Sequence, residues 1–215
     1  MTSTPGLLQL IRSSQPDDAN RLPVLDAALD TFLEFGIRRS NMADIAKRAG
    51  ISPATLYRRF ADKQAIVTAV GLREVRRFLA DVDRKIDHGA PADEQITALA
   101  LACLDGLRNH RLFQRLLITD PEILLPALTV DADRVLALGT DYLAEFIRRL
   151  QHRGQLPGYN PDYVAELLAR LALSLALTPH TRLPIDTEDR ARQYVTSYLI
   201  GIFRPASQPP AGPAR

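Results

Sequence analysis

The sequence predicts an all-α protein. Over most of the chain, apolar residues recur at the three- and four-residue spacing of a helix, and strand-like alternation is scarce. Glycine and proline breakers divide this pattern into segments of helical length. Apolar residues make up 46% of the chain, which is enough for a packed core. Residues 1–20, rich in Ser, Thr, Pro and Asp, and residues 206–215, with three prolines, are expected to be a flexible arm and a flexible tail.

Local signals mark the first two helices. The first is expected from about residue 22 to residue 35, because Gly36 provides a C-terminal stop. The second is expected to begin after Asn41, whose side chain can accept a hydrogen bond from the first turn of a helix. It ends at Ala49 and Gly50.

The next two helices also follow capping residues. Ser52 precedes a proline at the first helical position, so the third helix begins there and continues to about Phe60. Asp62 is expected to cap a long fourth helix that reaches roughly Ile86. The N-terminal part of the chain is therefore three helices followed by a longer one.

Residues 42–60 have the spacing of a helix-turn-helix. Ala46 is small where two helices cross closely, and Gly50 can adopt the positive φ angle of a tight turn. Leu56, together with Ile51, fills the space between the two helices. In DNA-binding proteins of this kind, the second helix of the motif enters the major groove.

A helical wheel of the third helix separates a core face from an outer face. Leu56 and Phe60 point inward, with Pro53 on their side. The outer face comprises Ala54, Thr55, Tyr57 and Arg58. Its arginine can donate two hydrogen bonds to guanine, and its alanine permits close approach to the bases. The threonine hydroxyl and the tyrosine phenol can reach phosphates, so this face suits the major groove.

Positive charge is concentrated around the motif. The formal net charge of the chain is only +2, and residues 71–215 contain 18 basic and 18 acidic side chains. Residues 36–63, in contrast, contain seven basic and two acidic side chains, a sum of +5. Lys63 lies in the first turn of the fourth helix, where an ammonium group and a helix N-terminus together favour a phosphate. These features indicate double-stranded DNA as a partner.

Residues 24–70 resemble the DNA-binding domain of the TetR family of transcriptional regulators. The matching segments are VLDAALDTFLEFGI and NMADIAKRAGISPATLYRRFADKQAIVTAV. The resemblance implies a helix-turn-helix DNA-binding domain at 21–70 and a helical effector-binding and dimerisation domain at 71–205. It also implies which residues bind DNA: contacts to the sugar-phosphate backbone from Asn41, Ser52, Thr55, Tyr57 and Lys63, base reading by Ala54 and Arg58, and Arg59 beside them.

The resemblance extends to function. It implies a ligand-responsive regulator, in the usual mode of the family a repressor, that binds a near-palindromic operator as a homodimer and is released by a small-molecule effector. The first alternative is a ligand-independent architectural DNA-binding protein, which needs no cavity in its second domain. The second alternative is a protein-interaction module, which would not bind specific DNA sequences.

The rest of the chain is expected to form six more helices, at 93–108, 110–119, 121–127, 131–152, 161–178 and 187–203. The helix at 161–178 carries a leucine-rich ridge beside an alanine ridge, with only a narrow polar stripe. Such a helix is expected to be buried on two sides, by its own domain and by a partner subunit. By resemblance, the last two long helices pair with their copies, and the expected interface residues are Ala165, Ala169, Ala172, Ala176, Tyr198 and Ile202.

A small-molecule pocket is expected, by resemblance, among the middle helices. Its candidate lining residues, each also suited to an ordinary core, are Leu104, Phe113, Leu117, Tyr142 and Phe146. No cofactor is expected, and no metal site, because the four histidines are scattered without ligand spacing. Cys103 is the single cysteine, which excludes an intramolecular disulfide and is more typical of an inert apolar side chain than of a redox sensor.

Other function classes lack their motifs. The chain contains no G-x-S-x-G, no P-loop and no G-x-G-x-x-G, so an enzyme is not expected. No secretory signal peptide is recognisable, and no apolar segment reaches the ~20 residues of a membrane span. We therefore expect a cytoplasmic protein with no membrane partner.

Overall fold

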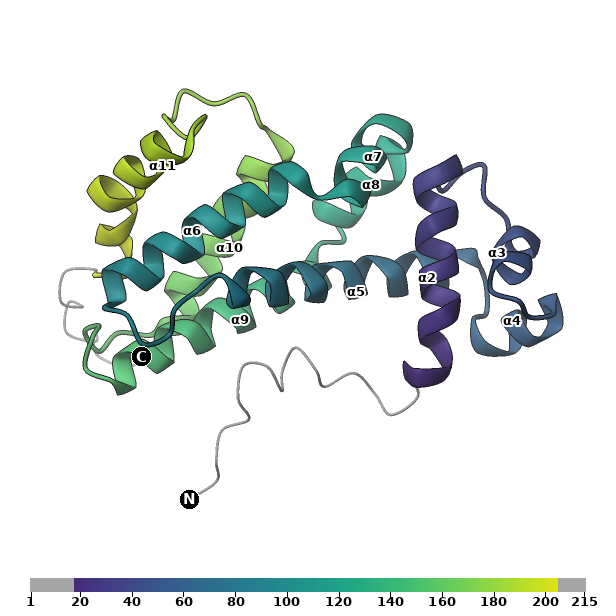
Figure 1. Cartoon of the computed structure of the whole chain (residues 1–215), viewed down its shortest axis with the longest axis horizontal. Coiled ribbons are helices and arrows are strands. Elements are labelled where there is room, and N and C mark those ends of the chain that lie inside the picture. The colour runs from purple at the N-terminus through teal and green to yellow at the C-terminus, as the bar shows by residue number, and fades with distance from the viewer. Residues whose placement is uncertain (1–17, 205–215) are drawn as a thin grey trace, which may run out of the picture. The chain divides into compact units, whose positions relative to one another are not determined.

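The computed structural model describes residues 18–204, and every regular element in that range is helical (Figure 1). The all-α prediction is therefore confirmed for this part of the chain. The expected tail at 206–215 and residues 1–17 of the expected arm lie outside the described residues. Residues 18–20, also expected in the arm, form the first turn of a helix instead. The helix continues through Pro23, which removes one main-chain hydrogen bond without ending it.

The four N-terminal helices follow the order that the sequence predicts. They are α2 (Asp18–Phe35), α3 (Met42–Arg48), α4 (Pro53–Arg59) and α5 (Lys63–Arg84). Two glycines have the positive φ angles that end helices and form turns: 81° at Gly36, after α2, and 68° at Gly50, between α3 and α4.

The predicted helix caps are present. The Asn41 side-chain oxygen accepts a hydrogen bond of 2.9 Å from the main-chain N–H of Asp44 in α3. Asp62 Oδ1 accepts one of 2.7 Å from the N–H of Ala65 in α5. The starts of α3, α4 and α5 are thus determined by short polar side chains close in sequence, which is why the sequence pattern locates them.

The remaining helices also lie close to their expected positions. They are α6 (Ala92–Asn109), α7 (Arg111–Thr119), α8 (Pro121–Leu128), α9 (Asp133–His152), α10 (Pro161–Leu177) and α11 (Glu188–Tyr194). The last expected helix, 187–203, is not one continuous α-helix. After α11 it widens into a π-helix, Val195–Leu199, and then tightens into a 3₁₀-helix, Ile200–Phe203. Both changes alter the residue spacing, so a 3.6-residue periodicity does not hold along this segment.

The helices form two compact units, whose division differs from the expected boundary at residue 70. The first unit comprises the described residues up to Ala80 together with Leu107–Val135, and the second comprises Asp81–Gly106 and the described residues from Leu136 onward. The helices α7 and α8, expected in the effector domain, therefore pack with the helix-turn-helix. Leu112 and Leu116 of α7 are buried in the same core as Phe32, Ile45 and Leu56. An apolar helix face specifies burial but not which neighbour provides it.

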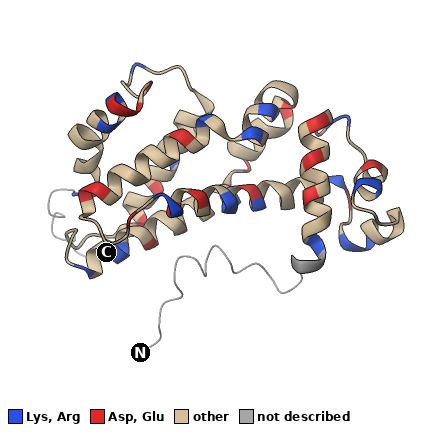
Figure 2. Ribbon diagram, in the orientation of Figure 1, with Lys and Arg blue, Asp and Glu red and all other residues tan. Residues whose placement is uncertain are grey.

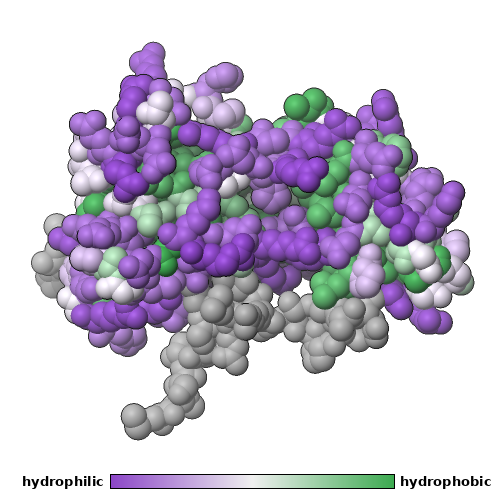
Figure 3. Space-filling model, viewed as in Figure 1, coloured by the Kyte–Doolittle hydropathy of each residue, from purple (hydrophilic) through white to green (hydrophobic). Residues whose placement is uncertain are grey.

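Apolar groups also reach the surface of the first unit. Figure 3 shows hydrophobic side chains over α7 and α8, among hydrophilic ones. Ile118 of α7 and Val130, just beyond α8, are the most exposed large apolar side chains among the described residues.

In the second unit, the alanine ridge of α10 faces the interior of its own protomer. Ala165, Ala169 and Ala176 are buried, and a Cβ at Gly139 of α9 would lie 3.7 Å from the Ala169 Cβ. Thr140 of α9 also donates a hydrogen bond of 3.2 Å to Glu166 of α10. The small residues thus allow α9 and α10 to approach closely. The buried alanines of this ridge therefore pack within their own protomer, and a contact between the ridge and a partner subunit stays a prediction.

Neither a membrane-spanning helix nor a metal-binding cluster is present in the described part of the chain. No helix between residues 18 and 204 is both long and apolar enough to cross a membrane. Over the same residues, no group of three or more His, Cys, Asp or Glu side chains is arranged to hold a metal ion.

Candidate nucleic-acid interface

The helix α4 has one face in the core and one face in solvent. Leu56 is completely buried, and Phe60, the C-terminal cap of α4, is nearly completely buried, as predicted. Ala54, Tyr57 and Arg58 are exposed on the other side. Pro53 was expected on the core side but is exposed, because it occupies the first position of the helix, beyond the contact with α3. The predicted base-reading pair and the phenol therefore share the solvent face.

Two hydroxyls lie together at the N-terminus of α4. Ser52 Oγ accepts a hydrogen bond of 3.2 Å from the main-chain N–H of Thr55 and lies 3.0 Å from Thr55 Oγ1. Ser52 is exposed and Thr55 is half-buried. This pairing fixes both rotamers before any ligand arrives, so the predicted phosphate contacts need little further ordering.

Asn41 caps the N-terminus of α3 as Ser52 caps that of α4. Its carbonyl oxygen is used by the cap, and the side chain is exposed. Because a primary amide carries two further N–H donors, the Asn41 side chain can cap α3 and donate to a phosphate at the same time. A contact between Asn41 and DNA stays a prediction.

Lys63 has a structural role that sequence reasoning missed. Its ammonium group donates hydrogen bonds of 3.0 Å each to the main-chain carbonyls of Ile37 and Ser40, in the loop between α2 and α3. An ammonium has three N–H donors, so one remains for the predicted phosphate. Replacing Lys63 would disturb this loop as well as a contact to DNA, so it is a poor probe of DNA binding alone.

The basic side chains of the motif differ in what they already bind. Arg38 pairs with Glu122 at 3.2 Å, and Arg48 pairs with Glu34. Among the residues that the structure describes, Arg39, Lys47 and Arg58 form no ion pair. Figure 2 shows Lys and Arg on α3 and α4, where they occupy the last turns. Lys47 and Arg39 belong to the basic stretch but are not among the predicted DNA contacts, since only the structure shows that they are exposed and unpaired.

Arg59, also expected to bind DNA, lies at the edge of the exposed face. It is half-buried, and its main-chain carbonyl accepts a hydrogen bond of 3.2 Å from Arg21 Nη2. The Arg21 guanidinium also lies over the Phe60 ring, 5.1 Å from its centroid. Arg21 therefore holds the C-terminus of α4 against α2.

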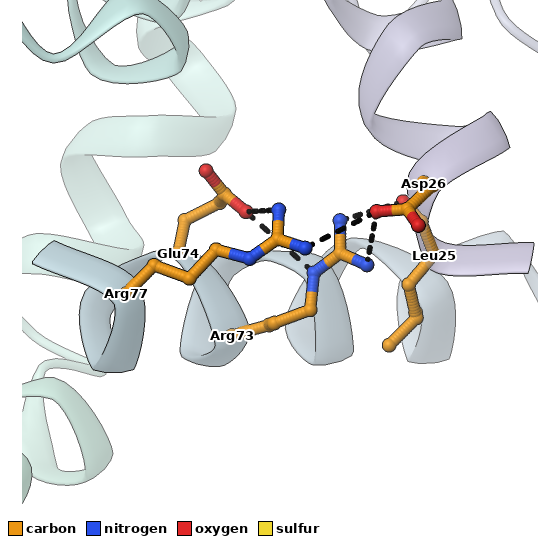
Figure 4. A network of polar contacts seen from close by, with 5 residues as sticks. All are labelled: Leu25, Asp26, Arg73, Glu74 and Arg77. Carbon is orange, nitrogen blue, oxygen red and sulfur yellow. Dashed lines mark hydrogen bonds and ion pairs between the residues drawn. The ribbon is translucent and has the colours of Figure 1, made fainter. Parts of the chain in front are cut away.

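A buried arginine joins α2 to α5 (Figure 4). Arg73 donates hydrogen bonds to Asp26 Oδ1 (2.9 Å) and to the Leu25 carbonyl (3.0 Å), and its Nε lies 3.5 Å from Glu74 Oε1. Burial, and then the neighbouring charge of Arg77, lower the pKa of Arg73, while Asp26 and Glu74 oppose that shift. The guanidinium stays charged, because arginine is not deprotonated in proteins. This network fixes α2, which supports α3 and α4, on the first part of α5.

The five candidate pocket residues do not belong to one unit. Phe113 and Leu117 lie on α7 in the first unit, whereas the other three lie in the second, on α6 and α9. Tyr142 is buried and donates a hydrogen bond of 3.2 Å to Asp83 Oδ1. Burial first, and then the Asp83 charge, raise the pKa of this phenol. Tyr142 thus satisfies a buried carboxylate, Phe146 is buried and Leu104 is half-buried.

Cys103 has the properties of an unreactive thiol. Burial raises its pKa to about 12, so the side chain remains protonated at physiological pH. Because the thiolate is the reactive form of cysteine, a redox role is not favoured.

Large apolar side chains are exposed on the last helices of the second unit. Leu167 of α10 is 55% exposed and Tyr198 of the π-helix is 69% exposed, and Tyr163 is exposed as well. Of these three, only Tyr198 was expected at an interface; Ala172 and Ile202, which were also expected there, are half-buried. The exposed large apolar side chains of these helices are therefore two tyrosines and a leucine, of which sequence reasoning placed only Tyr198 at an interface.

Comparisons with known proteins agree with the geometry of the motif. The model of the family described as bacterial regulatory proteins, tetR family, matches residues 24–70. The HTH-type transcriptional regulator UidR of Escherichia coli K12 is 28% identical over 185 residues, which are 85% of this chain and 88% of that protein.

Two solved structures share the fold. The TetR family repressor AlkX of a Dietzia strain has a TM-score of 0.65 at 22% identity, with 86% of this chain and 99% of that chain covered. SmeT in complex with triclosan has a TM-score of 0.54 at 21% identity, with 91% and 100% covered. The helix-turn-helix lies inside the matched segment, so residues 24–70 form a DNA-binding domain of the tetR family of bacterial regulatory proteins. Over most of its length the chain is similar to DNA-binding transcriptional regulators and not to enzymes.

Proposed function

We propose that this protein is a ligand-responsive transcriptional repressor. In this proposal it binds a near-palindromic operator as a homodimer and releases it when a small molecule binds. We also propose that it acts in the cytoplasm, on chromosomal DNA.

The exposed face of α4 is the observation that carries the DNA-reading part of the proposal. Ala54 and Arg58 lie in solvent on the side opposite the buried Leu56. Among the described residues, Arg58 has no ion-pair partner, so its guanidinium needs to break no interaction before it meets a base. One good bidentate contact discriminates against a wrong base by about 1–3 kcal/mol.

The experiment that tests DNA reading is selection of bound duplexes from a random pool by the full-length protein. We expect a consensus of two related half-sites in inverted orientation, because a two-fold symmetric dimer presents two copies of α4. Enrichment of no sequence above the starting pool would overturn the proposal and would favour a protein-interaction module. A single, unrepeated half-site would argue against binding as a symmetric dimer.

The homodimer is supported by the exposed side chains of the second unit. Tyr163, Leu167 and Tyr198 are large, apolar and in contact with water in the single chain. Burying such side chains at a subunit interface is favourable, by roughly 25 cal/mol for each Å² of apolar surface removed from water. Sedimentation analysis at micromolar concentration tests this part directly, and a monomer would contradict it.

Ligand response is supported by similar proteins. SmeT forms a complex with triclosan, and AlkX is implicated in the biodegradation of n-alkanes. We propose that this chain likewise binds a largely apolar small molecule. The continuous helix α5 is suited to couple binding to DNA release, because it begins in the DNA-binding unit at Lys63 and ends at Arg84, beyond that unit's boundary at Ala80.

A thermal-shift screen of apolar compounds distinguishes this proposal from a ligand-independent architectural DNA-binding protein. A compound that binds only the folded state increases the free energy of unfolding by RT ln(1 + [L]/Kd) and therefore raises the melting temperature. A true effector must also bind more weakly when the selected duplex is present, by the same factor by which it weakens duplex binding. Equal affinity with and without the duplex would show that the compound is not an inducer.

A further inference from the structure

A buried carboxylate from the junction of α7 and α8 binds the main chain of the loop that leads into the helix-turn-helix. Asp120 is only 1% exposed. Its Oδ1 accepts a hydrogen bond of 2.9 Å from the N–H of Arg38, and its Oδ2 accepts one of 3.2 Å from the N–H of Ile37. Thr119 Oγ1 donates a third, of 2.6 Å, to Oδ2. Each carboxylate oxygen therefore receives one main-chain N–H from the loop between α2 and α3.

The position of Asp120 would ordinarily serve a different purpose. It is the N-cap residue of α8, where an aspartate side chain usually accepts a hydrogen bond from the first turn of its own helix. Here the side chain makes no such bond. The Asp120 side chain therefore does not cap α8. It bonds instead to the loop between α2 and α3, which is more than eighty residues away in the sequence.

The loop is shaped to receive this carboxylate. Gly36 has a φ angle of 81°, and a Cβ built on it would lie 2.6 Å from Asp120 Oδ2, closer than real Cβ contacts occur. A glycine is therefore required here both for the backbone conformation and for the approach of Asp120.

A positively charged side chain, Lys63, binds the same loop. Asp120 receives the N–H groups of Ile37 and Arg38, while the Lys63 ammonium donates to the carbonyls of Ile37 and Ser40. Four main-chain polar groups of the loop are thus bonded by two charged side chains, one on α5 and one between α7 and α8. Asn41, the cap of α3, follows directly, so the position of the loop determines where α3 and α4 begin.

We propose that Asp120 is a positioning residue for DNA binding, which fixes the pose of α3 and α4 through the main-chain N–H groups of Ile37 and Arg38. The pair α7–α8 is then part of the DNA-reading unit, and a change in α7 or α8 is transmitted to the recognition helix through this carboxylate. The inference rests on the proposed sequence-specific DNA binding.

The test compares Asp120→Asn with Glu122→Gln. Both substitutions remove one negative charge from the same turn, but Glu122 is exposed and bonds only the side chain of Arg38, at 3.2 Å. The probes are the duplex that the wild-type protein selects and a shuffled duplex of equal length, titrated by fluorescence anisotropy well below the melting temperature. We expect Asp120→Asn to weaken binding to the selected duplex by roughly tenfold, the equivalent of one charged hydrogen bond. Its effect on the shuffled duplex, and the effect of Glu122→Gln on either, should be below twofold.

Hydrogen exchange provides a readout that a general loss of stability would not produce. In the wild type, the amides of Ile37 and Arg38 should be protected although they lie in a loop. In Asp120→Asn these two amides should exchange at least about tenfold faster, while the amides in the middle of α2 keep their wild-type rates. If Asp120→Asn does not fold, the wild-type exchange rates of the two amides decide the question.

Three results would overturn the inference. These are unprotected Ile37 and Arg38 amides in the wild type, wild-type affinity of Asp120→Asn for the selected duplex, and an equal loss of affinity for the selected and shuffled duplexes. Failure to select any duplex would instead refute the proposed function and leaves the exchange measurement as the test of the Asp120 contacts.

Discussion

Replacing Gly36 by alanine should destabilise the protein much more than replacing Gly50, although both glycines have nearly the same backbone conformation. Their φ angles are 81° and 68°, and both lie in the first unit. An L-residue in this left-handed region costs about 1–2 kcal/mol, partly offset by about 0.4–1 kcal/mol from the lower entropy of the unfolded chain. Gly50→Ala should therefore reduce the free energy of unfolding by roughly 1 kcal/mol, because its Cβ meets nothing within 4 Å.

The additional cost at Gly36 comes from Asp120. The new Cβ would lie 2.6 Å from the carboxylate oxygen, so the carboxylate has to move away from the N–H groups of Ile37 and Arg38. Losing one hydrogen bond to a charged group costs about 1.5–3 kcal/mol. Gly36→Ala should thus reduce the free energy of unfolding by roughly 3 kcal/mol, about 2 kcal/mol more than Gly50→Ala.

The assay is urea denaturation followed by far-ultraviolet circular dichroism. All variants are compared at one protein concentration, because the stability of a dimer depends on it. The double variant Gly36→Ala with Asp120→Ala should be more stable than the sum of the two single effects allows, since removing the carboxylate relieves the clash. Equal destabilisation by Gly36→Ala and Gly50→Ala would refute the reasoning.

Three further outcomes are expected. Burial alone would raise the pKa of Asp120, but its hydrogen bonds and the Arg38 charge outweigh burial and lower that pKa, so the carboxylate stabilises the folded state above its ordinary pKa of about 4. This stabilisation is lost as the pH falls through the lowered pKa. The free energy of unfolding of Asp120→Asn, measured by urea denaturation, should therefore depend less steeply on pH in this range, and a slope equal to that of the wild type would contradict the prediction. Leu167→Glu should convert the proposed dimer into folded monomers in sedimentation, whereas a dimer that persists would place the interface elsewhere. Cys103 is half-buried, and its raised pKa of about 12 should make it react with iodoacetamide far more slowly in the folded protein than in urea; rapid labelling of the folded protein would contradict the raised pKa.

The features that the sequence predicts correctly depend on residues close together in the chain. Asn41, Ser52 and Asp62 are side-chain caps that act within three residues, and Gly36 and Gly50 end helices through their own φ angles. The outward face of α4 follows from helical periodicity once its start is known. For this reason the amino-acid sequence alone locates the motif and most of the exposed face of α4, whereas the exposure of Pro53 and of the unpaired Arg39 and Lys47 is known only from the structure.

The features that the sequence does not predict depend on pairing between distant segments. The sequence marks Asp120 only as a helix breaker before a proline, because nothing near it indicates that its partners are Ile37 and Arg38. The alanine ridge of α10 is expected at a partner subunit, although Ala165 and Ala169 pack inside the protomer. Periodicity shows that a face is buried, but which neighbour buries it is determined by three-dimensional complementarity.

The most direct test of the account is whether Arg58 reads bases while its basic neighbours bind only the phosphate backbone. The measurement is the ratio of affinities for the selected and shuffled duplexes, titrated over a range of salt concentrations for the wild type, Arg58→Ala and Lys47→Ala. Both side chains are exposed and lack an ion pair within the described chain, so the two substitutions remove equal charge. We expect Arg58→Ala to lower the ratio by about 5–150-fold, the equivalent of about 1–3 kcal/mol. Lys47→Ala should leave the ratio unchanged and reduce the salt slope by about one. An unchanged ratio for Arg58→Ala would contradict the claim that the exposed face of α4 reads the DNA sequence.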